Sequence, residues 1–200
     1  MKTIPLKRDL ELLYEIGCFR FLQRNWKQFL NADFQNNSEH TFRVIWLALL
    51  IAKQENRGNH EKIIKMALVH DMAESRTGDL HYVSREYSSR DEVMGITDVL
   101  KNTSLETDLT ELWHEYETRK SIEAKIVKDA DNLDVDLELQ EQEVRGHRLK
   151  EFWKDMRQYV YRHLYTGAAK KLFKEIQNSN PHDWHFHARN RYNTGDWRKK

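Results

Sequence analysis

Apolar residues recur at helical spacing along most of this chain, which is the pattern of an amphipathic α-helix. Only seven glycines and two prolines occur in 200 residues, so the turns that would separate short strands are scarce. The pattern predicts an all-α protein: a single-domain helical bundle over residues 1–180, with a C-terminal tail over 181–200. The predicted helices cover residues 9–30, 39–55, 60–76, 84–101, 105–118, 121–143 and 148–177.

Polar residues interrupt the third predicted helix where it looks most buried. Residues 63–69 are mostly apolar, and His70 and Asp71 follow them directly. A helix would place Glu74 on the same face, four positions beyond His70 and three beyond Asp71. Buried imidazole and carboxylate groups are costly unless they are paired or bound to metal. The segment therefore indicates a metal site, although a satisfied core histidine with two surface acids would have the same local sequence.

Two distant helices supply further candidate ligands. Ser38 is the expected N-cap of the second predicted helix, which places His40 in its first turn. Asp131 lies on the apolar stripe of the sixth predicted helix, and Asp134, three positions later, is a rival that periodicity does not exclude. The candidate ligands are therefore His40, His70, Asp71 and either Asp131 or Asp134.

Other acids of the sixth predicted helix have a simpler interpretation. Asp129 is close in sequence to Lys125 and Lys128, so it is expected to be solvated. The acidic residues at positions 134, 136, 138, 141 and 143 are likewise expected to form mainly a solvated face, apart from the rival role of Asp134.

The order His40, His70-Asp71, Asp131 resembles the HD-domain metal-dependent phosphohydrolases, a family named after its His-Asp pair. The match is to the branch of 5'-deoxynucleotidases that act on deoxynucleoside monophosphates. It extends over about residues 15–145, through the stretches at 38–40, 67–74, 77–80 and 111–118. The resemblance implies a bundle of the HD-domain type and an enzyme that releases phosphate from nucleoside 5'-monophosphates, with 2'-deoxy forms preferred. It also implies Asp131 as the fourth ligand.

The donor set predicts the cofactor and the catalytic residues. Two histidines and two aspartates suit one divalent transition metal ion per chain, and Mn, Co, Fe, Ni and Zn all remain candidates. Glu74 is expected to orient or deprotonate the attacking water, a role that the resemblance also implies. Asp79 is expected to contact substrate or water from the following loop, with a capping or turn role as the alternative.

Substrate-binding residues follow from the resemblance. The deoxynucleotidases have an arginine and a tryptophan upstream of the first metal histidine, and Arg24 and Trp26 match them here. Asn25 stands where some members have the arginine, and Lys27 is an alternative phosphate contact. The runner-up functions are a phosphodiesterase or triphosphohydrolase on another nucleotide, and a non-catalytic nucleotide-binding HD protein.

Composition narrows the partners and the compartment. With 33 basic and 32 acidic residues, the net charge of +1 gives no general drive toward a nucleic acid polymer or an anionic membrane. The expected partner is the small nucleotide that the resemblance implies. The longest apolar run, residues 44–52, is too short to span a bilayer. Cys18 is the only cysteine, and the first residues lack the apolar segment of a secretion signal. We expect a cytoplasmic protein.

The tail has a character of its own. It carries His182, His185 and His187 close to Trp184, and it ends in three basic residues at 198–200. Such a segment is more typical of a surface loop or a docked tail than of a second metal site. Its aromatic residues favour docking on the body of the protein or on a second subunit, which would make the protein a homodimer.

Overall fold

The computed structural model describes residues 6–189, and every regular element among them is helical, which confirms the predicted fold class. None of these helices has the length and apolarity needed to cross a membrane. Three short 3-10 turns occur at Phe19–Phe21, Asn25–Gln28 and Ser84–Glu86. The α-helices are α1 (Leu6–Cys18), α2 (Asn37–Glu55), α3 (His60–Val69), α4 (Glu74–Thr77), α5 (Glu92–Leu100), α6 (Glu106–Thr118), α7 (Ile122–Val144), α8 (Leu149–Phe152), α9 (Lys154–His163), α10 (Gly167–Asn178) and α11 (Asp183–Phe186).

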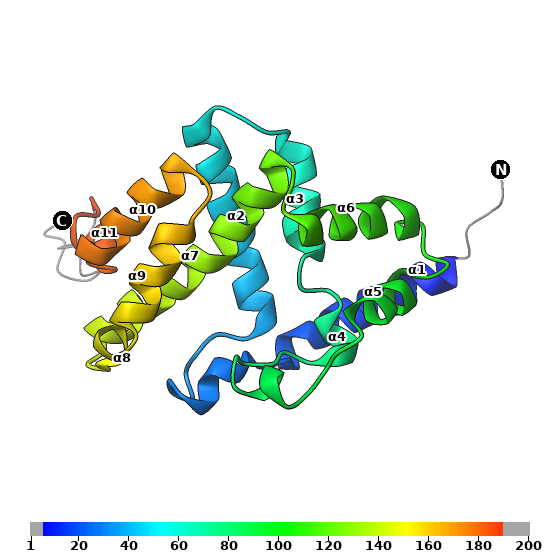
Figure 1. Ribbon diagram of the computed structural model, residues 1–200, viewed down its shortest axis with the longest axis horizontal. Helices are drawn as coiled ribbons and strands as arrows, with labels where there is room; N and C mark the ends of the chain where they lie inside the picture. Colours follow the sequence, from blue (N-terminus) through cyan, green and yellow to red (C-terminus); the bar gives the residue numbers. More distant parts are fainter. Residues whose placement is uncertain (1–5, 190–200) are drawn as a thin grey trace, which may run out of the picture.

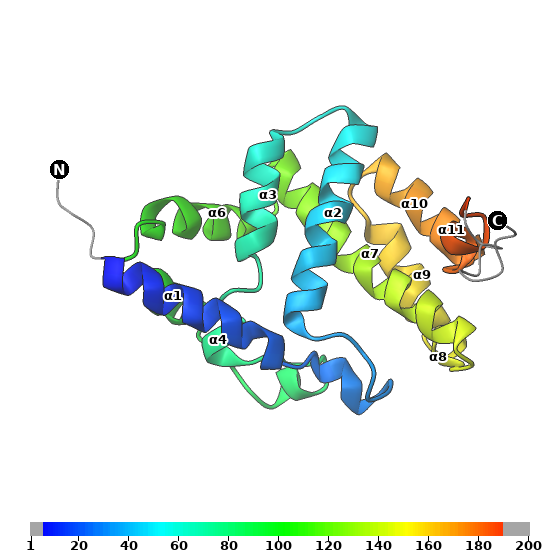
Figure 2. The ribbon, with the colours of Figure 1, turned by 180° about the vertical axis from the view of Figure 1, so that it is seen from behind.

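The helices are arranged around α7, the longest of them (Figure 1). Helices α2 and α3 pack on α7. Helices α8 to α11 gather at one end of the molecule, and α1, α4, α5 and α6 gather at the other, as the reverse view also shows (Figure 2). The functional residues predicted above come from the central helices and from the segments next to them.

Two apolar clusters hold this arrangement together. The larger joins α2, α3, α7 and α10 through side chains such as Val44, Ile63 and Phe173, which are almost fully buried. The smaller joins α1, α5 and α6 to the end of α3, through Val69 and Trp113 among others. Each large apolar side chain contributes about 1.5–3 kcal/mol when it is fully buried. The two clusters meet where α3 ends, next to the predicted metal site.

The start of α2 differs from the prediction by two residues. Asn36, not Ser38, is the N-cap, and its side chain accepts a hydrogen bond from the backbone of Glu39. The Glu39 carboxylate accepts one from the backbone of Asn36 in return, which completes a capping box. His40 consequently lies at the end of the first helical turn, with its side chain inside the bundle.

The predicted third helix is broken at the His-Asp pair. Helix α3 ends at Val69, and the chain tightens into turns in which Met72 N donates to Val69 O and Glu74 N to Asp71 O. These three-residue hydrogen bonds wind the backbone more tightly than an α-helix does. Helix α4 then ends at Gly78, whose φ of +73° is easily adopted only without a Cβ. Hydrophobic periodicity runs through this break because the backbone stays close to helical.

Three other predicted helices are shorter or divided. The first ends at Cys18 because Leu22 is extended and accepts a hydrogen bond from Asn37 N. The fourth begins only at Glu92, where the side chain of Asp91 caps the helix. The last is divided into α8, α9 and α10, and Thr166 caps the third piece. In each case a cap or a tertiary contact overrides the helical pattern.

The described part of the tail is a short surface helix. His182, which precedes α11, and His185 share a hydrogen bond of 2.9 Å between Nδ1 and Nε2. The Trp184 side chain is 79% exposed, so its indole does not pack on the body of the protein. The expected docking of Trp184 on the body is therefore wrong, and docking on a second subunit stays a prediction. The three basic residues at 198–200 lie outside the described residues.

Candidate metal centre and substrate cavity

The structure brings the four predicted ligands together. His40 comes from α2, His70 and Asp71 from the tight turn after α3, and Asp131 from α7. His40 Nε2 lies 3.4 Å from both His70 Nε2 and Asp71 Oδ2, and 3.2 Å from Asp131 Oδ1. His70 Nε2 lies 3.4 Å from Asp71 Oδ2. Atoms bound about 2.1 Å from one ion are about 3.0–3.4 Å apart in octahedral or tetrahedral sites, so this cluster fits a single cation.

The charges of the cluster also fit a cation. Burial and the charge of Arg24 oppose protonation of His40, but hydrogen bonds to Asp131, Asp134 and Asp71 raise its pKa well above the ordinary range. Burial lowers the pKa of His70. The three carboxylates around His40 thus favour a positive charge on its ring, although each of them also pairs with a cation: Arg24, Lys128 or Arg43. Two nitrogen and two oxygen donors suit a divalent transition ion.

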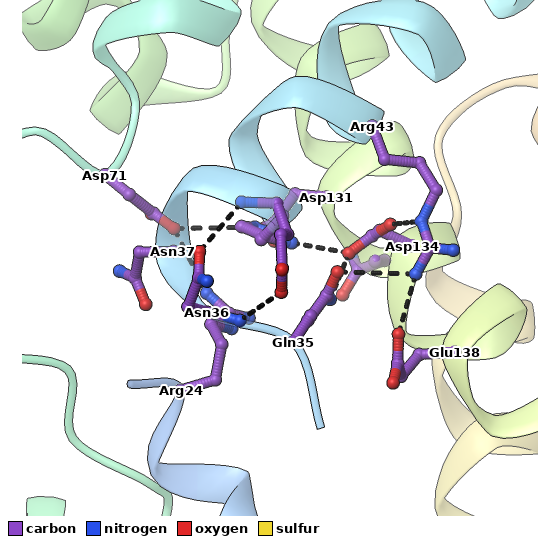
Figure 3. A network of polar contacts seen from close by, with 12 residues as sticks. Arg24, Gln35, Asn36, Asn37, Arg43, Asp71, Asp131, Asp134 and Glu138 are labelled. Atoms are coloured by element: carbon purple, nitrogen blue, oxygen red, sulfur yellow. Dashed lines mark hydrogen bonds and ion pairs between the residues drawn. The ribbon is translucent and has the colours of Figure 1, made fainter. Parts of the chain in front are cut away.

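Asp131 and Asp134, which the sequence leaves as rivals, face different atoms of His40. Asp131 Oδ1 lies beside Nε2, within the donor cluster. Asp134 Oδ2 lies 2.6 Å from Nδ1, on the opposite side of the ring. Only Asp131 therefore shares the cluster with the other candidate ligands. Asp134 also pairs with Arg43, which reaches Glu138 at the same time (Figure 3).

The prediction that the acidic residues of α7 form mainly a solvated face is wrong for most of them. Asp134, Asp136 and Glu138 are buried, and so is Asp129. Asp129 accepts hydrogen bonds of 2.8 Å from the backbone amides of Tyr165 and Thr166, just before α10. Each of these carboxylates has a partner that comes from a distant part of the chain or from another turn of α7. Helical periodicity contains no information about such partners.

Glu74 is a buried carboxylate beside the donor cluster. Its side chain is buried at the wall of the cavity that contains His70 and Asp71. Asn37 Nδ2 donates to Oε2 at 2.5 Å, and Arg90 Nη1 lies 3.2 Å from Oε1. Burial, followed by the negative charge of Asp71, raises the pKa of Glu74 well above its ordinary value. A carboxylate tuned in this direction is better suited to proton transfer near neutral pH.

Asp79 also lines the cavity, but its contacts are those of a structural carboxylate. Its Oδ2 accepts a hydrogen bond of 2.8 Å from the backbone amide of Asn25, and its carbonyl accepts one from the Asn25 side chain. These contacts hold the segment that carries Arg24 and Trp26. They favour the capping alternative, and a direct contact with substrate stays a prediction.

Arg24 and Trp26 both line the same cavity, which has a volume of about 490 Å³. Arg24 Nη1 donates to Asp71 Oδ2 at 3.1 Å, whereas its buried Nε has no hydrogen-bond partner. The Trp26 ring packs edge-on against Trp153 at 4.6 Å and lies 6.2 Å from Tyr82. The cavity thus has the guanidinium of Arg24 beside the cluster of candidate ligands, and aromatic rings along its wall.

Three basic residues that line the cavity were not predicted from the sequence. Lys128 Nζ lies 2.7 Å from Asp131 Oδ2, and the guanidinium of Arg119 lies 3.4 Å from the Tyr116 ring centre. Arg90 reaches the cavity from the loop before α5. These cations come from separate segments, and a basic residue on a helix surface is usually solvated. Only the spacing of Lys128, three positions before Asp131, indicates a shared helix face.

This chain belongs to the HD-domain family, as the helical bundle and the His-Asp cluster indicate. The family described as "HD domain" matches residues 16–177. Human 5'-deoxynucleotidase HDDC2 is 36% identical over 153 residues, which cover 72% of this chain and 74% of the relative. The zebrafish (Danio rerio) protein of the same name is 34% identical over 147 residues, covering 69% and 72%.

Solved structures show the same fold. The PH0347 protein from Pyrococcus horikoshii OT3 has a TM-score of 0.65 at 26% identity, covering 84% of this chain and 96% of its own. A predicted metal-dependent phosphohydrolase from Magnetospirillum magnetotacticum MS-1 has a TM-score of 0.70 at 18% identity, covering 86% and 93%. At 18% identity, the similarity to the Magnetospirillum protein supports a shared fold and not a shared activity.

Proposed function

We propose that this protein is a metal-dependent phosphomonoesterase that releases phosphate from nucleoside 5'-monophosphates, with 2'-deoxy forms preferred. The observation that carries the proposal is the cluster of His40, His70, Asp71 and Asp131 at the wall of a cavity with cations and aromatic rings. Relatives named 5'-deoxynucleotidase support the substrate class and the preference for deoxyribose.

The four clustered side chains are the proposed metal ligands, and Mn, Co, Fe, Ni and Zn are the candidate ions. A bound divalent cation would polarise a phosphoryl oxygen and acidify a water molecule. All four proposed ligands come from one chain, and three of them, His40, His70 and Asp131, have donor atoms within 4.8 Å of one another.

Glu74 is the proposed general base. Its carboxylate accepts a proton from the water whose oxygen forms the new bond to phosphorus. The ester bond between phosphorus and the 5' oxygen breaks, and the proton passes to the leaving nucleoside, so the reaction is balanced. Asn37 and Arg90 hold the two carboxylate oxygens at 2.5 and 3.2 Å, which fixes the orientation of the carboxylate.

Arg24 and Lys128 are the proposed phosphate contacts, because each cation lies next to a candidate ligand of the ion. Trp26 offers an aromatic face for the base or sugar, and Asp79 positions the segment that carries it. A cavity of about 490 Å³ is in the usual range for a small-molecule site. This size and lining suit a mononucleotide.

Phosphate release from a nucleotide panel tests the proposal. The wild-type protein, loaded in turn with Mn²⁺, Co²⁺ and Zn²⁺, is incubated with ribo- and deoxynucleoside mono- and triphosphates and with a cyclic dinucleotide. We expect the fastest release from deoxynucleoside monophosphates, and none with Asp131→Asn. Faster cleavage of triphosphates or cyclic dinucleotides would favour the runner-up hydrolases. Binding of nucleotides without turnover would indicate a non-catalytic HD protein.

A further inference from the structure

The second ring nitrogen of His40 has a buried carboxylate partner outside the donor cluster. His40 Nδ1 lies 2.6 Å from Asp134 Oδ2, and both side chains are completely buried. A neutral imidazole carries its proton on one nitrogen and a lone pair on the other. A hydrogen bond from Nδ1 to a carboxylate therefore leaves the lone pair on Nε2, which faces His70, Asp71 and Asp131.

Asp134 is itself held firmly in place. The side chains of Gln35 and Arg43 both donate hydrogen bonds to it. Arg43 also reaches Glu138 at 2.9 Å (Figure 3). A third contact, with Glu141 at 2.8 Å, means that its guanidinium joins two turns of α7 to α2. The orientation of the Asp134 carboxylate is thus set by groups that take no part in the donor cluster.

The two histidines of the cluster are oriented by different groups. His70 Nδ1 lies 2.7 Å from the backbone carbonyl of Ala67, a neutral acceptor within its own turn. His40 has a charged acceptor from another helix. A carboxylate that accepts the hydrogen bond from one ring nitrogen makes the other nitrogen a stronger metal ligand than a backbone carbonyl does. Mutation of such a hydrogen-bond partner typically costs about 10–100-fold in metal affinity.

We propose that Asp134 is a positioning residue of the metal centre: it accepts the hydrogen bond from His40 Nδ1 and thereby aims Nε2 at the ion. The inference rests on the proposed metal site. It assigns Asp134 a role that is separate from ligation, and it makes Arg43 and Gln35 the groups that support this role.

Metal affinity tests the inference without any nucleotide. Co²⁺ affinity is measured by competition with a chelator in the wild type, Asp134→Ala and Asp134→Asn. Asp136→Asn is the matched control, because Asp136 is another buried α7 carboxylate paired with an arginine, Arg157. Since this variant is expected to be destabilised, all Kd values are measured at a temperature at which its circular dichroism shows that it is folded. We expect Asp134→Ala to raise the Kd by about 10–100-fold and Asp134→Asn to raise it less, since the amide oxygen can still accept the hydrogen bond. The control should stay close to wild type.

Nitrogen chemical shifts of the histidine side chains provide the second readout. In the ion-free wild type the neutral form of His40 should carry its proton on Nδ1, and Asp134→Ala should lose this preference. Unchanged Kd in both Asp134 variants, or equal weakening in Asp136→Asn, would overturn the inference. If Asp134→Ala does not fold, the nearly isosteric Asp134→Asn decides. Failure of the wild type to bind Co²⁺ would instead refute the proposed metal site.

Discussion

Two acids of α7 show opposite solutions for a buried carboxylate. Asp136 has both oxygens paired with Arg157, at 2.9 Å from Nε and 2.6 Å from Nη2. Asp131 has one oxygen, Oδ2, 2.7 Å from Lys128 Nζ, and its other oxygen, Oδ1, lies 3.2 Å from His40 Nε2 within the donor cluster. A buried charge is tolerated when it has a partner. The Asp136–Arg157 pair, which we call the matched pair, uses both carboxylate oxygens to connect two helices. Asp131 keeps Oδ1 for the donor cluster, which we call the unmatched cluster because this oxygen faces an imidazole and not an arginine or lysine.

The largest effect is expected from breaking the unmatched cluster. Asp131→Asn removes one ligand and one negative charge, so the protein should lose its bound metal and all measurable phosphate release. The helical circular dichroism of the metal-free protein should be unchanged, because Lys128, the cation that loses its carboxylate, is partly exposed to solvent. Asp136→Asn should keep its metal. Elemental analysis of both variants tests this contrast, and normal metal content in Asp131→Asn would remove Asp131 from the ligand set.

Replacement of Glu74 distinguishes metal binding from proton transfer. Glu74→Gln keeps the size of the side chain and the hydrogen bond from Asn37 but cannot accept the water's proton. We expect normal metal content and a fall in kcat of about 10²–10⁴-fold, the usual contribution of a general base. Metal analysis and steady-state kinetics on a deoxynucleoside monophosphate provide the two measurements. Loss of metal would make Glu74 a ligand, and an unchanged kcat would exclude it from the chemistry.

The matched pair should matter more for folding. Asp136→Asn leaves the buried guanidinium of Arg157 without its counter-ion, which typically costs about 3–5 kcal/mol of unfolding free energy. Asp131→Asn should cost less, because the cation that it leaves unpaired, Lys128, is partly exposed whereas Arg157 is buried. Urea denaturation of the two metal-free variants against the metal-free wild type measures both values. Equal destabilisation would mean that the cluster is as well matched as the pair.

The contrast between these acids also marks how far the sequence could lead. His40, His70, Asp71 and Asp131 are predictable from their order along the chain and from the donor chemistry of their side chains. Asp134 and Asp136 are not, because Arg43 and Arg157 lie 91 and 21 positions away from them. The same holds for the tight turn at residues 70–73, which keeps a helical hydrophobic pattern. Local patterns predict the ligands, and only the packing of helices reveals what orients and balances them.

A carboxylate with an exposed partner completes the comparison and should give the smallest effect. Glu15 on α1 lies 2.6 Å from Arg76 Nε and accepts a hydrogen bond of 2.9 Å from Ser75. Burial opposes its charge, but Arg76 and Ser75 lower its pKa below the ordinary value of 4.5. The unfolded chain therefore binds this proton more tightly than the folded protein does. The pair stabilises the fold fully above pH 4.5, and the contribution is lost as the pH falls through the lowered pKa.

Glu15→Gln should therefore unfold with less difference between neutral pH and pH 3 than the wild type does. The expected change is below about 1 kcal/mol, because Arg76 is nearly half exposed and solvent screens the pair. Urea melts of both proteins at the two pH values, in the absence of metal, measure it. An unchanged pH dependence would show that Glu15 is matched no better in the folded protein than in water, in contrast to Asp136. A larger loss of unfolding free energy in Glu15→Gln than in Asp136→Asn would show that burial of the partner does not decide how much a paired carboxylate contributes to stability.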